Sequence, residues 1–298
     1  MGNTQRLGAL LCVVVMLLGC QSVRSGLTEE QQTTLPTYDK VQARADERVG
    51  AIDRFWATAV VGLRYVDVDG KKRRQQGEGH FQVVKPANVA LTIGKLGEIY
   101  LLLGCDDDQF WWIERLDEKV AYVGDQNGAR DLALRRMGVP VLPTDLLMLA
   151  DLNAWPAPGS ESAGTVIECE REDFDPSQIF AVRFVEPDRI RVVYLTRLAF
   201  EPVGVDLISP RGELIARSDL SNFERVLNHI DPLQHQRVPT RITVEVPSAQ
   251  SRIELTLSRA EISSRRPKPV VFDFSELVRR FRIDTIVRLE DIQREPAP

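Results

Sequence analysis

The sequence predicts an α+β fold that is mainly antiparallel β: a curled sheet or half-barrel of about ten or eleven strands closed by a helical plug. Three observations predict it. From Ala59 to Ile262, most apolar residues recur with a period of two, as in strands that bury one face. Only two sizeable helical patterns accompany these strands. One of them, at 144–153, is almost wholly apolar and interrupts the strands, which favours a curled sheet plugged by helices over two packed sheets.

The amino terminus has the layout of an export signal. Arg6 supplies a positive charge, and an uncharged apolar run follows from Gly8 to Gly19. This run is shorter than the roughly 20 residues that a membrane-spanning helix needs. The sequence Leu17-Leu18-Gly19-Cys20 resembles the bacterial lipobox, in which the cysteine sulfur receives a diacylglyceryl group and the chain is cut just before it. We therefore expect a lipoprotein signal peptide at 1–19 and lipidation of Cys20. An uncleaved anchor and a cut elsewhere are the alternatives.

Lipidation of Cys20 implies a membrane location. Several acyl chains hold a protein lastingly, since each buried methylene contributes about 0.8 kcal/mol. Gln21 follows the cysteine, and by resemblance to enterobacterial lipoproteins this residue implies export to the outer membrane. We expect the protein at the periplasmic face of a bacterial membrane, the outer membrane, held there by acylated Cys20. Residues 20–37 are polar and typical of a tether, so we expect a single domain over 38–298 with a C-terminal extension.

Composition excludes a disordered chain and does not favour a nucleic-acid partner. Hydrophobic residues make up 43% of the 298 residues, which is enough for a substantial core. The formal net charge is -5, and the basic run at 71–74 is typical of a solvated hairpin tip. Cys12 would leave with the signal peptide, so Cys105 and Cys169 remain. They either form a disulfide or stay separate thiols, since sequence does not show whether they meet.

The first elements of the folded part follow in order. Apolar residues at helical spacing predict a helix from Tyr38 to Trp56. Alternation with a period of two then predicts a hairpin, with Val61, Leu63 and Tyr65 sharing one face of its first strand and Phe81 and Val83 one face of its second. Further strands are expected at 87–93, 98–104, 109–115 and 119–125. The strand at 98–104 is apolar on both faces, so it should be covered on both.

The second half begins with the apolar segment 141–155. Thr144 can cap a helix there, and Leu146, Leu147, Met148 and Leu149 leave this helix little polar surface. Strands then resume, and they are expected at 163–169, 179–185, 189–195, 203–209, 213–219, 241–246 and 252–262. Asp273 with Glu276 predicts the start of a short helix that ends at Phe281.

The segment GHFQVVKP at 79–86 is similar to a strand of a known family. The periplasmic lipoprotein carrier LolA and its outer-membrane receptor LolB have a strand of this type, and Gly79, Phe81, Lys85 and Pro86 match its spacing. The following hairpin, with Asp106 and Trp111, and Leu142-Pro143 before a leucine-rich helix also resemble family features. The resemblance covers roughly 38–262. It implies a LolA/LolB-like fold, binding of acyl chains, lipids or lipoproteins, and a role in lipoprotein or lipid trafficking.

The sequence departs from the family pattern at one position. The carrier has an arginine shortly after the proline, and this arginine holds a helical lid by hydrogen bonds to backbone groups. Ala90 stands at that place here. Together with an acylated Cys20, this difference favours a receptor-like or more distant member of the family.

The candidate ligand-binding residues are the apolar side chains that should face the hollow of the curled sheet. They are Leu63, Tyr65, Phe81, Val83, Val89, Leu91, Ile93, Leu146, Leu147 and Leu149. Plain core packing is the alternative for each, and only their collective excess favours a cavity for an acyl chain. We expect an outer-membrane-anchored lipoprotein that binds acyl chains or lipidated proteins. The alternative is a structural or interaction lipoprotein with a solidly packed β-sandwich and no ligand cavity.

No sequence motif predicts catalysis or a metal site. The run 106–108 supplies three aspartates but lacks the spacing of a calcium loop, and the acidic stretch 168–175 is typical of a solvated loop. His80, His229 and His235 lack zinc-site spacing, and the sequence contains no Gly-x-Ser-x-Gly motif. We therefore expect a binding protein with no enzyme activity, cofactor or metal.

Overall fold

The computed structural model describes residues 34–66, 70–115, 119–126, 141–234 and 236–292. Within the chain, Leu35–Pro298 forms one compact unit. The predicted signal peptide 1–19, the lipidation site Cys20 and the tether up to residue 33 lie outside the described residues. None of the described helices combines the length and the apolar character that crossing a membrane requires.

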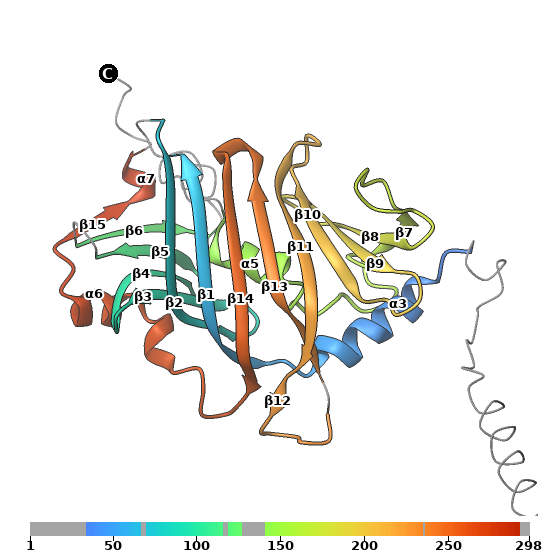
Figure 1. Ribbon diagram of the computed structural model, residues 1–298, viewed down its shortest axis with the longest axis horizontal. Coiled ribbons are helices and arrows are strands. Elements are labelled where there is room, and N and C mark those ends of the chain that lie inside the picture. The colour runs from blue at the N-terminus through green and yellow to red at the C-terminus, as the bar shows by residue number, and fades with distance from the viewer. Residues whose placement is uncertain (1–33, 67–69, 116–118, 127–140, 235, 293–298) are drawn as a thin grey trace, which may run out of the picture. The chain divides into compact units, whose positions relative to one another are not determined.

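Fifteen strands form one sheet (Figure 1). Their order is β15-β6-β5-β4-β3-β2-β1-β14-β13-β11-β10-β9-β8-β7, and β12 pairs with β14. The strands are β1 (Arg54–Val66), β2 (Lys72–Val84), β3 (Asn88–Lys95), β4 (Glu98–Cys105), β5 (Gln109–Glu114), β6 (Val120–Asp125), β7 (Thr165–Glu168), β8 (Ile179–Val185), β9 (Ile190–Thr196), β10 (Pro202–Ile208), β11 (Leu214–Arg225), β12 (Leu227–Asn228), β13 (Arg237–Val246), β14 (Ser251–Ile262) and β15 (Thr285–Arg288). The pairs β12–β14 and β15–β6 are parallel, and the other described pairs are antiparallel.

The mainly antiparallel sheet confirms the predicted class, but the strand count of ten or eleven was wrong. The segments expected from alternation correspond to thirteen of the fifteen strands, already more than the predicted count. The other two, β12 with two residues and β15 with four, are too short to show a clear period of two in the sequence. The predicted barrel-like closure is not found either. In the described part of the chain the sheet is open, with β15 and β7 at its two ends. The alternative of a two-sheet sandwich does not describe this single sheet.

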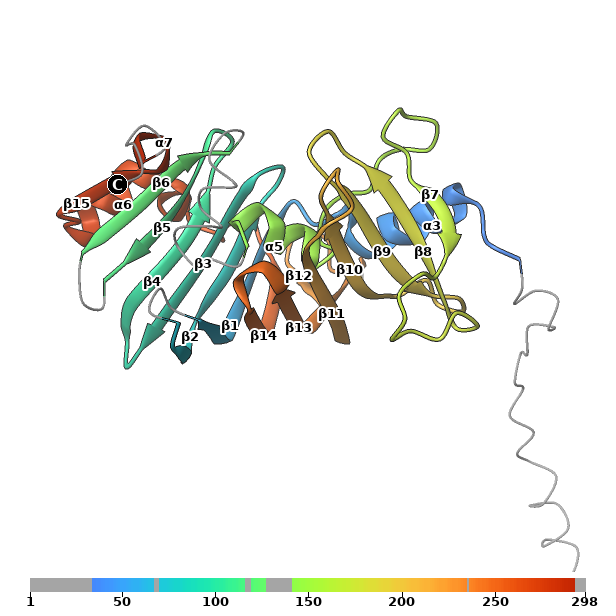
Figure 2. The ribbon, with the colours of Figure 1, turned by 90° about the horizontal axis from the view of Figure 1, so that it is seen from above.

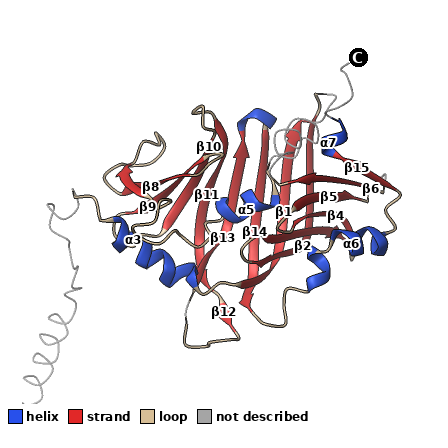
Figure 3. Cartoon of the chain, turned by 180° about the vertical axis from the view of Figure 1, so that it is seen from behind, coloured by secondary structure: helices blue, strands red, loops and turns tan. Residues whose placement is uncertain are grey.

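The sheet is strongly curved. Figure 2 shows two wings, β2 to β6 and β10 to β7, that rise on the same side of the central strands. The concave face carries α3 (Tyr38–Ala45), its π-helical continuation η1 (Asp46–Gly50) and α5 (Pro143–Leu149), as Figure 3 shows. The other helices are η2 (Pro247–Ala249), η3 (Pro269–Phe272), α6 (Phe274–Phe281) and α7 (Leu289–Ile292).

The largest core lies between the concave face and these helices. Successive strand residues point to opposite faces, so β1 contributes every second residue, namely Phe55, Ala57, Ala59 and Val61. The helices contribute Val41, Ala45, Val49, Leu146, Leu147 and Leu149. Burial of a large apolar side chain stabilises the fold by about 1.5–3 kcal/mol, so this layer contributes much of the stability of the fold.

Strand β4 carries apolar residues on both faces, and both faces are covered, as the sequence predicted. Leu101 and Leu103 lie in the concave core. Leu102 faces the other way and packs with Trp111 and with Leu277 of α6. The predicted C-terminal helix therefore covers the outer face of one wing.

Two helix boundaries differ from the prediction. The helical spacing from Tyr38 continues only to Gly50, and Trp56 belongs to β1, where pairing with β2 and β14 outweighs the spacing. Thr144 is not the N-cap of α5. The helix begins at Pro143, and the Leu142 amide donates to Asp145 Oδ2 at 3.1 Å. By contrast, α6 is capped as predicted, because Asp273 accepts from the Glu276 amide at 3.0 Å.

Candidate functional site beneath helix α5

The structure brings the predicted ligand-binding residues together, with one exception. All of them except Tyr65 belong to, or pack against, the concave core; those fully within it are Phe81, Val83, Val89, Leu91, Ile93, Leu146, Leu147 and Leu149. Leu63 is partly buried against this core. Tyr65 lies two residues beyond Leu63 on β1, and its hydroxyl accepts from Gln75 Nε2 at 3.1 Å. The sheet and α5 therefore form one continuous apolar layer.

This layer is closed. Phe81, Val89 and Leu149 belong to this layer and are 0% exposed, so water does not reach their side chains. The three leucines of α5 pack directly over β3, β4 and β10. Helix α5 therefore covers this part of the concave face.

Helix α5 and the residues after it form one unit, residues 143–152, called here the α5 segment. The Ala150 amide donates to the Leu146 carbonyl at 3.0 Å, and the Leu152 amide to the Leu147 carbonyl at 3.1 Å. Asp151 lies between them in the left-handed region, with φ 47°. This is the usual way in which a helix end satisfies its last carbonyl groups. The segment therefore carries Asp145 near its beginning and Asp151 near its end.

Polar contacts attach the α5 segment to the body at both ends. Arg189 Nη1 donates to Asp145 Oδ1 at 2.7 Å. Arg48, on η1, donates to the Asp151 carbonyl at 3.1 Å and forms an ion pair with its carboxylate. Ser218 Oγ, on β11, donates to the Leu149 carbonyl at 2.6 Å. These contacts tie the apolar cover to three different elements.

The charged groups at these attachments form a connected chain, called here the lid network. It consists of Arg48, Asp145, Asp151, Glu186, Arg189 and Arg191. Glu186 bridges two of the arginines, at 3.5 Å from Arg189 Nε and 3.2 Å from Arg191 Nε. The carboxylates of Asp145 and Asp151 are 1% and 0% exposed. Charges so far from water depend on their partners, because desolvation of each costs several kcal/mol.

Sequence reasoning missed the lid network. Its signal was nevertheless present: an apolar helix with an aspartate near each end, and two arginines, Arg189 and Arg191, at the start of an apolar strand. Ala90, the residue expected at the place of the carrier's arginine, lies on the opposite face of β3 from the core residues Val89 and Leu91 and so faces away from α5. In this chain, Arg48 and Arg189 hold the helix instead.

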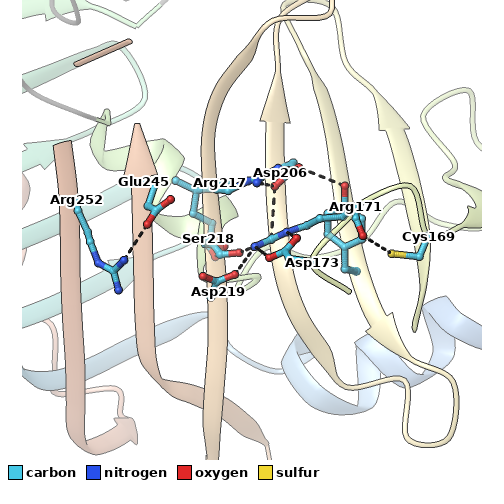
Figure 4. Close-up of polar contacts among 11 residues, drawn as sticks. Cys169, Arg171, Asp173, Asp206, Arg217, Ser218, Asp219, Glu245 and Arg252 are labelled. Atoms are coloured by element: carbon cyan, nitrogen blue, oxygen red, sulfur yellow. Dashed lines mark hydrogen bonds and ion pairs between the residues drawn. The ribbon is translucent and has the colours of Figure 1, made fainter. Parts of the chain in front are cut away.

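Another buried arginine, Arg171, lies on the opposite face of the sheet. Arg171 donates from Nε to Asp173 at 2.8 Å and from Nη1 to the Ser218 carbonyl at 3.2 Å, and its Nη2 forms an ion pair with Asp219 (Figure 4). Asp206 lies 3.7 Å from Nη1. We call these residues the Arg171 network. They attach the loop before β8 to the outer face of β10 and β11.

Residues of the predicted family motif have structural roles. A Cβ on Gly79 would lie 1.7 Å from the Thr92 carbonyl oxygen of β3, so this position requires glycine. Burial lowers the pKa of the Lys85 ammonium to about 8, although this group donates to the Val49 carbonyl at 3.1 Å. Lys85 thus connects β2 to η1, the element that carries Arg48.

The two cysteines do not form a disulfide, and the acidic turn has a structural role. Cys105 and Cys169 are both free thiols, and burial raises the pKa of the Cys105 thiol to about 12. Asp106 Oδ1 accepts from the amides of Asp108 and Gln109, so it stabilises the turn between β4 and β5. Within the described residues, no group of three or more His, Cys, Asp or Glu side chains is arranged to hold a metal ion.

Solved structures provide the comparison with known proteins. A LolA superfamily protein of Nitrosomonas europaea superposes on 80% of this chain and 98% of its own, with a TM-score of 0.51 and 15% sequence identity. A DUF1329 family protein of Desulfovibrio piger superposes on 80% of this chain and 97% of its own, with a TM-score of 0.53 and 14% identity. The chain has a LolA-like fold. The resemblance predicted from 79–86 and the segments after it is therefore confirmed for the fold. No family model matches the chain, and no curated protein sequence matches it.

Proposed function

We propose that this protein is a lipoprotein, anchored through acylated Cys20 at the periplasmic face of the bacterial outer membrane, that binds acyl chains of lipids or lipidated proteins between its concave face and α5. The binding would serve lipid or lipoprotein trafficking and involves no chemical step. The LolA-like fold and the lipobox-like sequence before Cys20 support the proposal. The predicted residues, from Phe81 on the sheet to Leu149 on α5, would contact the ligand.

The observation that carries this proposal is that a single short helix covers the apolar face. The part of the α5 segment that is helical has only seven residues. It contributes Leu146, Leu147 and Leu149 to the core, and exposing them costs about 5–9 kcal/mol in total. Sixteen methylenes buried in their place contribute about 13 kcal/mol. Association itself costs at least about 4 kcal/mol, so the apolar contributions to the exchange nearly balance, as reversible delivery requires.

Displacement of a neutral fluorescent probe tests this proposal. The purified protein, freed of detergent, is mixed with N-phenyl-1-naphthylamine, and monooleoylglycerol is added. We expect saturable displacement by the neutral acyl chain. Leu91→Trp, which fills the concave face, should abolish it, whereas Leu102→Trp, equally buried on the outer face of the neighbouring strand, should leave it unchanged. Absence of displacement in the unmodified protein would overturn the proposal.

The anchor is tested separately. Cys20→Ala should remove the acyl chains, and growth with globomycin should leave the signal peptide uncleaved, so each should change the mass of the protein found in the cell. An unchanged mass and an unchanged membrane fraction would end the lipidation part of the proposal and leave the acyl-binding part standing.

The complete burial of Phe81, Val89 and Leu149 favours a second candidate function. In this case the protein is a structural or interaction lipoprotein whose concave face stays filled by α5. It would bind a partner through its exposed surface. Protein that purifies without lipid and does not bind the fluorescent probe would support this candidate.

A further inference from the structure

Arg191 is a buried cation with an unused hydrogen-bond donor. Its side chain is 3% exposed, and its place on β9 puts it on the concave face with Val193. Nε donates to Glu186 at 3.2 Å, and the guanidinium lies 4.1 Å from the centre of the Phe184 ring. Nη1 has no hydrogen-bond partner among the described residues. A buried charged donor without a partner is rare in native proteins and calls for a physical reason.

The nearest carboxylate does not satisfy this donor. Asp151 Oδ1 lies 3.9 Å from Arg191 Nη1, beyond hydrogen-bond distance. That oxygen accepts instead from Trp155 Nε1 at 3.0 Å, and the Asp151 carboxylate is also paired with Arg48. Arg191 thus lies beside a carboxylate that is shared among other donors.

Two more buried arginines lie in the same network. The side chains of Arg48 and Arg189 are each 9% exposed. Each forms a close ion pair with a carboxylate of the α5 segment: Arg48 with Asp151 and Arg189 with Asp145. The segment therefore supplies two of the four carboxylates that pair with these arginines, and Glu186 and Asp188 supply the other two.

We propose that Arg48, Arg189 and Arg191 form a binding site for the anionic group of an acyl ligand, a carboxylate or a phosphate, and that Asp145 and Asp151 take the place of this group while the site is closed. This inference rests on the proposed acyl-chain binding. It adds the class of ligand: an acyl chain that ends in an anion.

An anionic group can replace Asp145 and Asp151 because both aspartates lie on the α5 segment and the three arginines lie on the body. When the α5 segment moves, both aspartates move with it, because residues 143–152 are joined by helix-type hydrogen bonds. The body then keeps three arginines against the carboxylates of Glu186 and of the half-exposed Asp188. Partly desolvated guanidinium groups bind carboxylate or phosphate through paired hydrogen bonds, and Arg191 Nη1 already offers one donor. An anionic acyl ligand therefore replaces both the apolar and the charged contacts of the segment, whereas a neutral one replaces only the apolar contacts.

The test compares ligands that have the same oleoyl chain and different polar ends. Oleate carries a carboxylate, oleoyl lysophosphatidate a phosphate, and monooleoylglycerol no charge. Each displaces N-phenyl-1-naphthylamine, which is itself uncharged, from the purified, detergent-free protein. We expect at least one of the two anionic ligands to act at about tenfold lower concentration than monooleoylglycerol. A ratio of this size corresponds to the free energy of about one charge-assisted hydrogen bond. The order of oleate and lysophosphatidate distinguishes a free fatty acid from a phospholipid as the source of the anion.

Variants separate a binding role from a structural one. Arg191→Met should reduce the preference for anionic ligands, taken as the ratio of displacing concentrations within one variant, to within about twofold, because one charge-assisted hydrogen bond is lost. A change in the attachment of α5 acts on all three ligands and cancels in this ratio. Arg191→Lys should restore part of the preference. Arg171→Met removes an equally buried arginine from the outer face and should keep the preference in full. If Arg191→Met does not fold, Arg189→Lys, which keeps the charge and loses the paired geometry, should still lower the preference.

The outcomes also separate this inference from the proposed function. Equal displacement by all three ligands in the unmodified protein would overturn the anion site and leave acyl-chain binding standing. An anion preference that survives in both Arg191→Met and Arg189→Lys would overturn it as well. Displacement by none of the three ligands would overturn the proposed function and the anion site together.

Discussion

The two faces of the sheet each bury an arginine network, and the networks differ in where their carboxylates lie. In the Arg171 network the arginine side chain is 2% exposed, but those of Asp173 and Asp219 are 55% and 54% exposed. In the lid network both carboxylates that the α5 segment provides, Asp145 and Asp151, are almost fully buried. Water therefore reaches two of the three acidic partners of Arg171, the exception being Asp206, which is 5% exposed, and it is excluded from both carboxylates of the α5 segment.

The difference distinguishes a fixed attachment from an exchangeable one. The Arg171 network joins strands to the loop before β8, and each of the three guanidinium nitrogens donates a hydrogen bond. The lid network joins the short helix α5 to the body, and Arg191 keeps an unused donor. A network that is desolvated, shared between two parts and incompletely satisfied is suited to exchanging one of its partners.

The largest expected effect comes from neutralising a buried carboxylate of the lid network. Asp151→Asn keeps a residue that tolerates the left-handed conformation but leaves Arg48 and Arg191 without that charge. We expect the free energy of unfolding to fall by about 3–5 kcal/mol in urea titrations. Amide exchange should accelerate first at residues 143–152.

The matched control lies in the other network. Asp219→Asn neutralises a carboxylate that is 54% exposed, and we expect a loss of at most about 1 kcal/mol. Equal losses in Asp151→Asn and Asp219→Asn would show that burial does not distinguish the two networks.

A smaller effect is expected where Ser218 holds the end of α5 by a hydrogen bond. Ser218→Ala removes the hydroxyl that donates to the Leu149 carbonyl and leaves that buried carbonyl without this donor. We expect a loss of about 1.5 kcal/mol in the free energy of unfolding. The Ser218 carbonyl still accepts from Arg171, so exchange in the loop around Asp173 should not change. Faster exchange there than in the α5 segment would contradict this assignment.

The smallest effect is a dependence on pH that arises from Lys85. Its pKa of about 8 in the folded protein lies below that of the unfolded chain, because burial disfavours the ammonium. The unfolded chain therefore binds more protons between pH 8 and about 10.5, and the contribution of Lys85 to stability rises through this window. After screening by water we expect a rise of about 1 kcal/mol. The difference in urea midpoint between Lys85→Met and the unmodified protein should change over this window; a constant difference would refute the shift.

The sequence predicted the concave layer well, because alternation along a strand is a local property. Phe81 and Val83, and Val89 and Leu91, lie on the face that their spacing predicted. Strand β15 was missed because its four residues are ordered by pairing with β6, a long-range contact that leaves no periodic signal.

The sequence shows the charged residues of the site but does not show that they meet, for a related reason. Asp145 and Arg189 are 44 residues apart, and Arg48 and Asp151 are 103 apart. Charged residues at helix and strand ends are usually solvated, and only the curvature of the sheet shows that these are buried together. Local sequence patterns thus predict the apolar residues of the site, whereas the contacts among its charged residues depend on the topology of the sheet.

The most direct test of the central claim is whether the α5 segment moves when an acyl ligand binds. Spin labels at Thr144→Cys on α5 and Leu96→Cys in the exposed turn between β3 and β4, with Cys169→Ser, allow the distance between helix and sheet to be measured by double electron–electron resonance. We expect oleate to shift this distance distribution to a distinctly longer population. An unchanged distribution in a sample where oleate is bound would show that the helix is a fixed part of the core, and would contradict the claim.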